Sequence, residues 1–375
     1  MEESQAKKSQ PSAKPESKES ATDVLHFEKW ISSLGERKAT DLHLLVGNVP
    51  SIRIDAKIQP LMDEEIITAE RLERIVEHLL SEDELKSFQE KKQLVISRTL
   101  KKSMRFRIHF YFSRGYAGLS LRHLQDAFIP ISELPNSMLL KETAGSKQGL
   151  YVVSGPFDSG KTSTVRSLIS EINQTQAKYI ITLESPIEYI IASDKSVVVQ
   201  REIGKDIQSF EKGLTGLHDE DLDVLVVGEL EELGVLEQIL EIASSGRLVI
   251  AITSGNHIVS VLEHLRDLAA EEDRARILHL LADVLIGISA QVLLPKVGGG
   301  RYLVVSNIIA TNPIKSLIHE GKFDQIPNIM QTSGESGMMT MDKALTEAVR
   351  QGIVIMQDAK EHAIDINQFN VLVAH

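Results

Sequence analysis

Eight consecutive residues near the middle of the chain have the types and spacing that bind phosphate. They match the spacing G-x-x-x-x-G-K-T and read Gly155-Pro156-Phe157-Asp158-Ser159-Gly160-Lys161-Thr162. An apolar, strand-like run at 150–154 precedes them, and a helical pattern begins at Lys161. In that context the backbone N–H groups would surround phosphates, Lys161 would meet the β and γ oxygens, and the Thr162 hydroxyl would hold Mg²⁺. The sequence therefore predicts a nucleoside triphosphate site for ATP and Mg²⁺, to which the adjacent Ser163 also contributes.

Asp158 is unusual in such a loop. A carboxylate among phosphate-binding N–H groups repels phosphate unless it points away or is neutralised. Some translational GTPases carry a similar Asp, so GTP is the alternative nucleotide. The chain has no Asn-Lys-x-Asp guanine-reading motif, which favours adenine. A glycine turn that merely joins a strand to a helix is the structural alternative.

Two glutamates follow apolar runs at positions where a nucleotide-hydrolysing site needs carboxylates. Glu229 ends the run 223–229, as a Walker B residue would, and Glu184 ends the apolar part of the run 180–188. A carboxylate at the end of a neighbouring strand positions the metal or the attacking water. Either residue alone also fits a solvated strand end. Beside the phosphate loop, both are predicted to be catalytic, and Thr162 and Glu229 are the predicted Mg²⁺ ligands.

The elements that would carry these residues divide the chain into four parts. Residues 1–22 are almost free of apolar side chains and predict a disordered tail. Residues 23–130 combine an amphipathic helix with Trp30 in its apolar face, strand-like runs and a helical stretch at 69–88. Residues 131–148, which follow Pro130 and contain Pro135 and Gly145, predict a linker with a short helix.

Residues 149–375 form the last predicted part. Apolar runs at 150–154, 179–183, 224–227 and 248–252 alternate with helical stretches such as 161–173 and 234–244. That alternation predicts a mostly parallel sheet wrapped by helices, so the fold class is α/β behind an α+β first domain.

Composition excludes several classes of protein. The formal net charge of −12 argues against a general nucleic-acid binder. The chain has no cysteine, which rules out disulfide frameworks and Cys-ligated zinc. No apolar run approaches the ~18 to 20 residues of a spanning helix, and the first residues lack the order of a secretory signal. We expect a cytoplasmic protein, with peripheral docking at the inner membrane as a further expectation.

Several motifs, taken in order, resemble those of type II/IV secretion superfamily ATPases, closest to the type IV pilus retraction (twitching motility) ATPases. The match covers almost all of residues 36–353. In the first domain it rests on Ala39-Thr40-Asp41-Leu42-His43-Leu44, Pro50-Ser51-Ile52-Arg53, Arg105-Phe106-Arg107-Ile108-His109-Phe110 and Leu121-Arg122. In the second it rests on the phosphate loop, Glu184-Ser185-Pro186-Ile187-Glu188, Gln200-Arg201-Glu202-Ile203-Gly204, Gly228-Glu229 and Gly337-Met338-Met339-Thr340-Met341-Asp342.

The resemblance implies a PAS-like domain followed by a RecA-like P-loop ATPase domain with a helical C-terminal region. It also implies a homohexameric ring with ATP between the two domains of each protomer. Arg107 and Arg122 are the arginines of the first domain that would reach the phosphates; a surface or inter-domain ion pair is their alternative role. A pilus platform membrane protein and a related pilus ATPase are the implied further partners.

The chain departs from the family pattern where nucleotide is sensed. The family usually has Asp at position 185, arginines at 215, 219 and 231, and histidines at 247 and 254. This chain has Ser185, Thr215, Asp219, Glu231, Arg247 and Ser254 at those positions. Losing several cations weakens the stabilisation of transition-state charge. Two functions stay open: a hydrolysing pilus or secretion motor, and a divergent ATP-binding paralogue with weak or no hydrolysis that regulates or scaffolds a motor ring.

Overall fold

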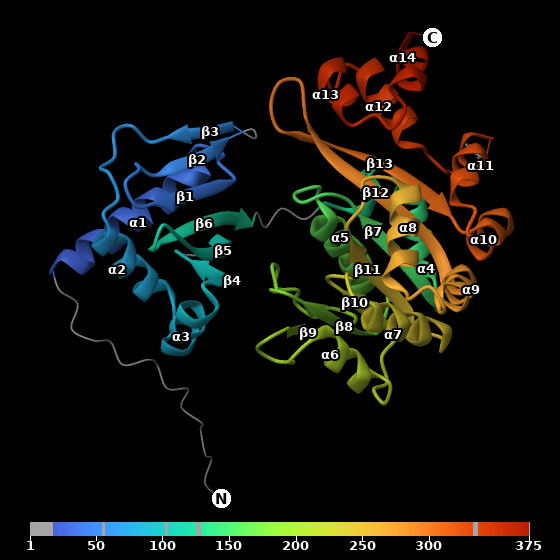
Figure 1. The fold of residues 1–375 in the computed structure, drawn as a ribbon, viewed down its shortest axis with the longest axis horizontal. Helices are drawn as coiled ribbons and strands as arrows, with labels where there is room; N and C mark the ends of the chain where they lie inside the picture. Colours follow the sequence, from blue (N-terminus) through green and yellow to red (C-terminus); the bar gives the residue numbers. More distant parts are fainter. Residues whose placement is uncertain (1–17, 55–56, 102–103, 125–128, 333–336, 375) are drawn as a thin grey trace, which may run out of the picture. The chain divides into compact units, whose positions relative to one another are not determined.

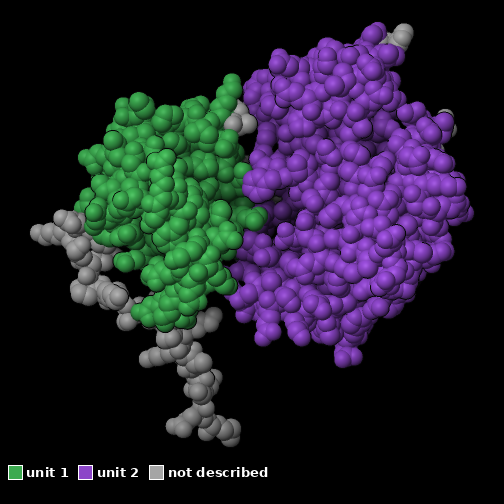
Figure 2. All heavy atoms as spheres, viewed as in Figure 1, with its two compact units in different colours: residues 1–125 green, residues 126–375 purple. Residues whose placement is uncertain are grey.

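The structure, a computed structural model, describes residues 18–54, 57–101, 104–124, 129–332 and 337–374. Its contacts divide the chain into two compact units, Met1–Gln125 and Asp126–His375 (Figure 2). Helix α1 (Lys18–Glu36) begins within the segment predicted as a tail, five residues before the predicted start at Asp23. Residues 1–17 of that predicted tail lie outside the described residues.

The first unit is an antiparallel sheet packed against helices (Figure 1). The strand order is β3-β2-β1-β6-β5-β4. The strands are β1 (Asp41–Leu45), β2 (Ser51–Ile54), β3 (Lys57–Pro60), β4 (Gln93–Leu100), β5 (Met104–Ser113) and β6 (Tyr116–Leu124). Trp30 of α1 is 1% exposed within the core that this sheet and the helices enclose, as the sequence predicted.

The helical stretch predicted at 69–88 is two helices, so this prediction is wrong as a single element. They are α2 (Ala69–Leu79) and α3 (Glu82–Lys91). Ser81 interrupts them with a capping box, in which its hydroxyl accepts from the Glu84 amide and the Glu84 side chain accepts from the Ser81 amide. Such a box starts a new helix because it satisfies amides that a helix start leaves unpaired.

The second unit contains a seven-stranded sheet in the order β13-β12-β7-β11-β10-β8-β9. All neighbouring pairs are parallel except β12 with β13. The strands are β7 (Gly149–Ser154), β8 (Tyr179–Glu184), β9 (Val197–Glu202), β10 (Val224–Val227), β11 (Leu248–Thr253), β12 (Leu285–Pro295) and β13 (Arg301–Ile309). The predicted mostly parallel sheet is confirmed, with β9, β12 and β13 as additional strands.

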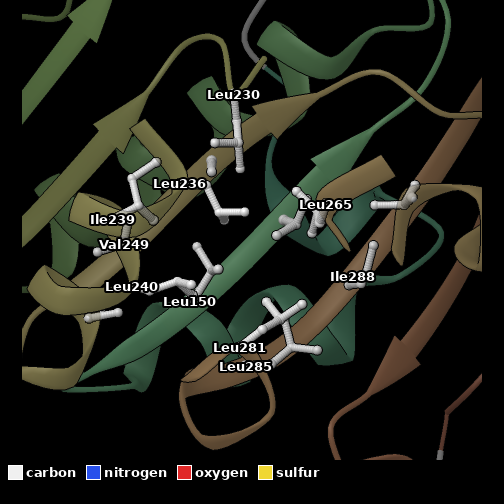
Figure 3. Close-up of a cluster of buried hydrophobic side chains, with 14 of the residues drawn as sticks. Leu150, Leu230, Leu236, Ile239, Leu240, Val249, Leu265, Leu281, Leu285 and Ile288 are labelled. Carbon is white, nitrogen blue, oxygen red and sulfur yellow. The ribbon is translucent and has the colours of Figure 1, made fainter. Parts of the chain in front are cut away.

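Helices cover both faces of this sheet. On one face lie α6 (Phe210–Leu217), α7 (Leu233–Ser244), α8 (Ile258–Leu268) and α9 (Arg274–Val284), which bury Leu150 and Val249 (Figure 3). On the other lie η1 (Ile131–Glu133), α4 (Ser137–Gly145) and α5 (Lys161–Thr175). The segment 131–148, predicted as a linker, therefore supplies apolar side chains to the second core, such as Leu139 and Leu140.

A smaller helical group closes the chain. It comprises α10 (Asn312–His319), η2 (Phe323–Gln325), α11 (Ile326–Thr332), α12 (Met341–Arg350), α13 (Met356–Glu361) and α14 (Ile366–Ala374). The last three pack around Leu345 and Phe369 against β12 and β13. The buried Asp342 carboxylate accepts hydrogen bonds from the amides of Ile364 and Asp365, at 2.7 and 3.1 Å, and so fixes the start of α14.

Candidate nucleotide site

The phosphate loop joins β7 to α5, as the sequence predicted. Gly155 has φ 155° and a Cβ there would lie 2.3 Å from the Ser159 hydroxyl, so only glycine fits. Gly160 caps α5 with φ 85°, and Asp158 has φ 64°. The loop therefore has the left-handed turns that aim backbone N–H groups toward one anion at the helix start.

Gln291 of β12 holds this loop and the start of α5 by two hydrogen bonds. Its Nε2 donates to the Ser159 carbonyl at 2.8 Å, and its Oε1 accepts from the Thr164 hydroxyl at 3.1 Å. The side chain is fully buried. Sequence reasoning missed this residue; the available signal was a single amide inside the apolar run 285–294, because a buried amide needs hydrogen-bond partners.

The Lys161 ammonium lies at the loop's own carbonyls. Nζ donates to the carbonyls of Gly155 at 2.7 Å and Pro156 at 2.8 Å. Burial lowers the pKa of Lys161, while the charges of Glu231, Glu229 and Glu188 act in the opposite direction. Three carboxylates therefore act electrostatically on the cation that the sequence assigned to the phosphates.

A buried hydroxyl in the loop fits a phosphate ligand. Among the described residues, the Ser159 hydroxyl has no hydrogen-bond partner although it is buried. Buried polar groups are nearly always paired, so a bound oxygen anion would satisfy it. Thr162, half-buried in the first turn of α5, and the exposed Ser163 follow directly.

The two predicted glutamates lie at the ends of neighbouring parallel strands, β8 and β10. The Gly228 amide donates to the Leu183 carbonyl at 2.8 Å and ties the two strand ends together. Glu229 is exposed, whereas Glu184 is half-buried. Glu184 Oε1 accepts from the Thr182 hydroxyl at 2.7 Å and from Gln200 Nε2 at 3.0 Å. Burial raises the pKa of the Glu184 carboxyl despite these hydrogen bonds.

Gln200 of β9 also orders the segment that follows Glu184. Its Nε2 donates to the Tyr189 carbonyl at 2.8 Å and its Oε1 accepts from the Ile191 amide at 2.8 Å. The Glu202 carboxylate accepts from the Ile187 amide at 3.2 Å. The segment from Ser185, which includes a cis Ser185–Pro186 peptide bond, is therefore held against the sheet edge.

Asp158 is paired with a cation. Its Oδ2 lies 2.8 Å from the Arg301 guanidinium, at the start of β13. From the sequence, Asp158 would repel phosphate unless it pointed away or was neutralised; the neutralising group is an arginine 143 residues further along the chain.

Positions where the chain departs from the family pattern contribute to local structure. Arg247 donates to the Ser245 hydroxyl at 2.8 Å and to the Glu220 carbonyl at 3.1 Å. Glu220 in turn accepts two hydrogen bonds from Arg201, both at 2.8 Å. His257, near the Ser254 position, caps α8 through the Ser260 amide. Arg247 thus stabilises the turn before β11.

The predicted arginines Arg107 and Arg122 belong to the other unit. They face each other in register on β5 and β6. Arg122 forms an ion pair at 2.9 Å with the buried Asp41 of the same unit, so this pair is neither at the surface nor between domains. Their reach to a nucleotide stays a prediction.

Within the part of the chain that the structure describes, no three His, Cys, Asp or Glu side chains are placed to hold a metal ion together. No helix among the same residues is long and apolar enough to cross a bilayer.

Comparisons with known proteins agree with this geometry. The family described as type II/IV secretion system protein matches residues 17–299. The type IV pilus retraction ATPase PilT of Pseudomonas aeruginosa is 29% identical, over 87% of this chain and 94% of the relative. A twitching motility protein of Neisseria gonorrhoeae is 30% identical, over 84% of each. The crystal structure of the pilus retraction motor PilT with bound ADP superposes with a TM-score of 0.79 at 33% identity, over 91% of this chain and 97% of that one.

Proposed function

The chain belongs to the type II/IV secretion system protein family, and we propose that it is an ATP-binding and ATP-hydrolysing hexameric motor of a type IV pilus or a related secretion machine. The observation that carries this proposal is the phosphate loop at the end of β7, with carboxylates at the ends of β8 and β10. Relatives named as pilus retraction and twitching motility proteins over most of their length support the choice of machine.

Each site residue has a distinct role in the proposed reaction. Lys161 binds the β and γ phosphates, and the loop amides with the Ser159 hydroxyl surround them. Thr162 and Glu229 would hold Mg²⁺, which would supply positive charge to offset the negative charge that develops on the phosphates. Glu184 orients the attacking water; its burial and its bonds from Thr182 and Gln200 keep one carboxylate oxygen at a fixed position.

Association with other copies is part of this proposal. Six protomers form a ring, and Arg107 and Arg122 of the first unit supply cations to the nucleotide phosphates. A pilus platform membrane protein and a related pilus ATPase are the proposed partners, at the cytoplasmic face of the inner membrane. A nucleic-acid partner is not proposed, because the net charge is −12.

One set of residues favours a second function, an ATP-binding paralogue with weak hydrolysis that regulates or scaffolds a motor ring. Ser185 replaces an acidic group next to Glu184, and Arg247 is engaged with Ser245 and Glu220. With Ser185 and Arg247 in place of the Asp and His of the family pattern, the site has fewer side chains that could sense the bound nucleotide.

Phosphate release separates the two functions. The purified chain is assayed with ATP, with and without Mg²⁺, beside a Lys161→Ala control. A motor releases phosphate in a Mg²⁺-dependent manner that the control lacks. Intact ATP binding without such release would contradict the motor and support the paralogue. Size in solution with and without ATP tests the ring; a monomer under both conditions would contradict it.

A further inference from the structure

The phosphate loop contains a carboxylate at a position where its backbone is left-handed. Asp158 has φ 64°, a conformation that Asp and Asn tolerate better than other non-glycine residues. Its side chain belongs to a loop whose amides, Lys161 and buried Ser159 hydroxyl are suited to an anion. An uncompensated negative charge there would repel a triphosphate.

A hairpin brings one arginine to this carboxylate. Strands β12 and β13 pair so that Pro295 faces Arg301, and the Lys296 amide closes the turn on the Gly300 carbonyl at 2.9 Å. Gly298, Gly299 and Gly300 have φ of 89°, 102° and 80°, which a tight turn of this shape requires. The turn thus places Arg301 at the first residue of β13, where its guanidinium lies 2.8 Å from Asp158 Oδ2.

The exposure of this pair indicates that stability is a small part of its role. Both side chains are 38% exposed, and ion pairs at such exposed positions contribute little to folding stability. The charge of Asp158 would also act on a phosphate bound in the same loop, by Coulomb repulsion.

We propose that Arg301 is a positioning residue for nucleotide binding: it neutralises the charge of Asp158 and so increases the affinity of the phosphate loop for a polyphosphate. This inference rests on the proposed nucleotide site and adds to it a residue from a distant hairpin. The sign follows from charge. Removing Arg301 leaves one additional negative charge beside the phosphates, removing the Asp158 charge leaves one additional positive charge, and removing both restores neutrality.

The experiment measures ATP affinity for four chains in the absence of Mg²⁺, so that binding is read without hydrolysis. Arg301→Ala is expected to raise the Kd about tenfold, and Asp158→Asn, which keeps the shape of the side chain, is expected to lower it about threefold. The double variant is expected within about threefold of the wild type. All differences should shrink as salt is raised from about 0.05 M to 0.5 M, because salt screens exposed charges.

Two controls separate the charge from other effects. Arg266→Ala removes a guanidinium from another exposed pair, Arg266 with Asp267 at 2.8 Å, in the last turn of α8; it should leave the Kd unchanged. Thermal unfolding without nucleotide shows whether a variant is folded. If Arg301→Ala unfolds, Arg301→Gln takes its place, and Arg301→Lys, which keeps the charge, should bind close to the wild type.

Arg301→Ala binding as tightly as the wild type would overturn the proposal, and so would a double variant as weak as Arg301→Ala alone. Lys161→Ala distinguishes this failure from that of the nucleotide site. Suppose that Lys161→Ala loses ATP binding, but that the Kd values of Arg301→Ala, Asp158→Asn and the double variant do not follow the expected order. Then only this inference is wrong. If the wild type shows no binding that Lys161→Ala removes, the nucleotide site and the inference are both wrong.

Discussion

The two sheets of the molecule bury their strands in different ways. In the second unit, every residue of β7, β10 and β11 is buried, because helices cover both faces. In the first unit, β5 alternates: Phe106, Ile108 and Phe110 are buried, and the residues between them are half-buried or exposed. A sheet covered on both faces leaves little room for charged groups except where its strands end, which is where the phosphate loop, Glu184 and Glu229 lie. A half-covered sheet can present polar groups such as Arg107 in the middle of a strand.

This comparison predicts that function and stability separate cleanly in the second unit. The strongest test is Lys161→Ala, at a strand end. We expect ATP affinity to fall on the order of 100-fold or more, because a charge-assisted phosphate contact is lost. The free energy of unfolding should change by about 1 kcal/mol or less, since only two hydrogen bonds to loop carbonyls are removed. Calorimetric titration and denaturant unfolding measure the two quantities, and unchanged affinity would contradict the site.

A test on consecutive residues addresses the strand bodies. Ile180 and Ile181 of β8 are both fully buried, on opposite faces of the sheet. Each Ile→Ala substitution should therefore cost about 2 to 5 kcal/mol of unfolding free energy. On β5, Ile108→Ala should cost a similar amount, whereas His109→Ala, at an exposed position, should cost about 0.5 kcal/mol or less. If Ile108→Ala and His109→Ala lowered the free energy of unfolding equally, the proposed difference between a sheet covered on one face and a sheet covered on both would be contradicted.

The smallest expected effect concerns Glu184. Burial raises the pKa of its carboxyl in the folded chain, so the folded chain holds that proton more tightly than the unfolded chain. The free energy of unfolding therefore falls as the pH rises from the unfolded pKa of Glu184 to its folded pKa, because the carboxylate ionises at a buried position. Above the folded pKa the whole loss is present. Glu184→Gln should raise the free energy of unfolding at pH 7 on the order of 0.5 kcal/mol. The gain should vanish at pH values below the unfolded pKa; denaturant unfolding across pH checks this, and a gain that persists in acid would contradict it.

The sequence predicted the parts of the fold that local patterns encode. The runs at 150–154 and 224–227 are apolar except for Ser154, are bounded by turn signals, and correspond to β7 and β10 within a residue. Strand β9 was missed because its apolar run is only the three valines 197–199, followed by Gln200, Arg201 and Glu202; it lies at the sheet edge, where its residues are mostly half-buried. Strand β12 was missed because its apolar residues continue directly from α9, where length and periodicity do not separate helix from strand.

The candidate site shows the same limit. The phosphate loop and the strand-end glutamates were predictable because their spacing along the chain carries the chemistry. Gln291 and Arg301 were not, because each acts on the loop from more than 130 residues away. Three glycines between the apolar runs of β12 and β13 do indicate a hairpin. No local pattern indicates which loop Arg301, the first residue of β13, will contact.

The tip of that hairpin is held from two directions. Arg301 contacts the phosphate loop, and the Val297 amide donates to the Ile353 carbonyl at 2.8 Å, just before α13. A backbone amide exchanges its hydrogen with solvent only when its hydrogen bond opens. The exchange rate of the Val297 amide therefore measures how often the contact with the C-terminal region opens, at a position four residues before the Arg301 that contacts the nucleotide loop.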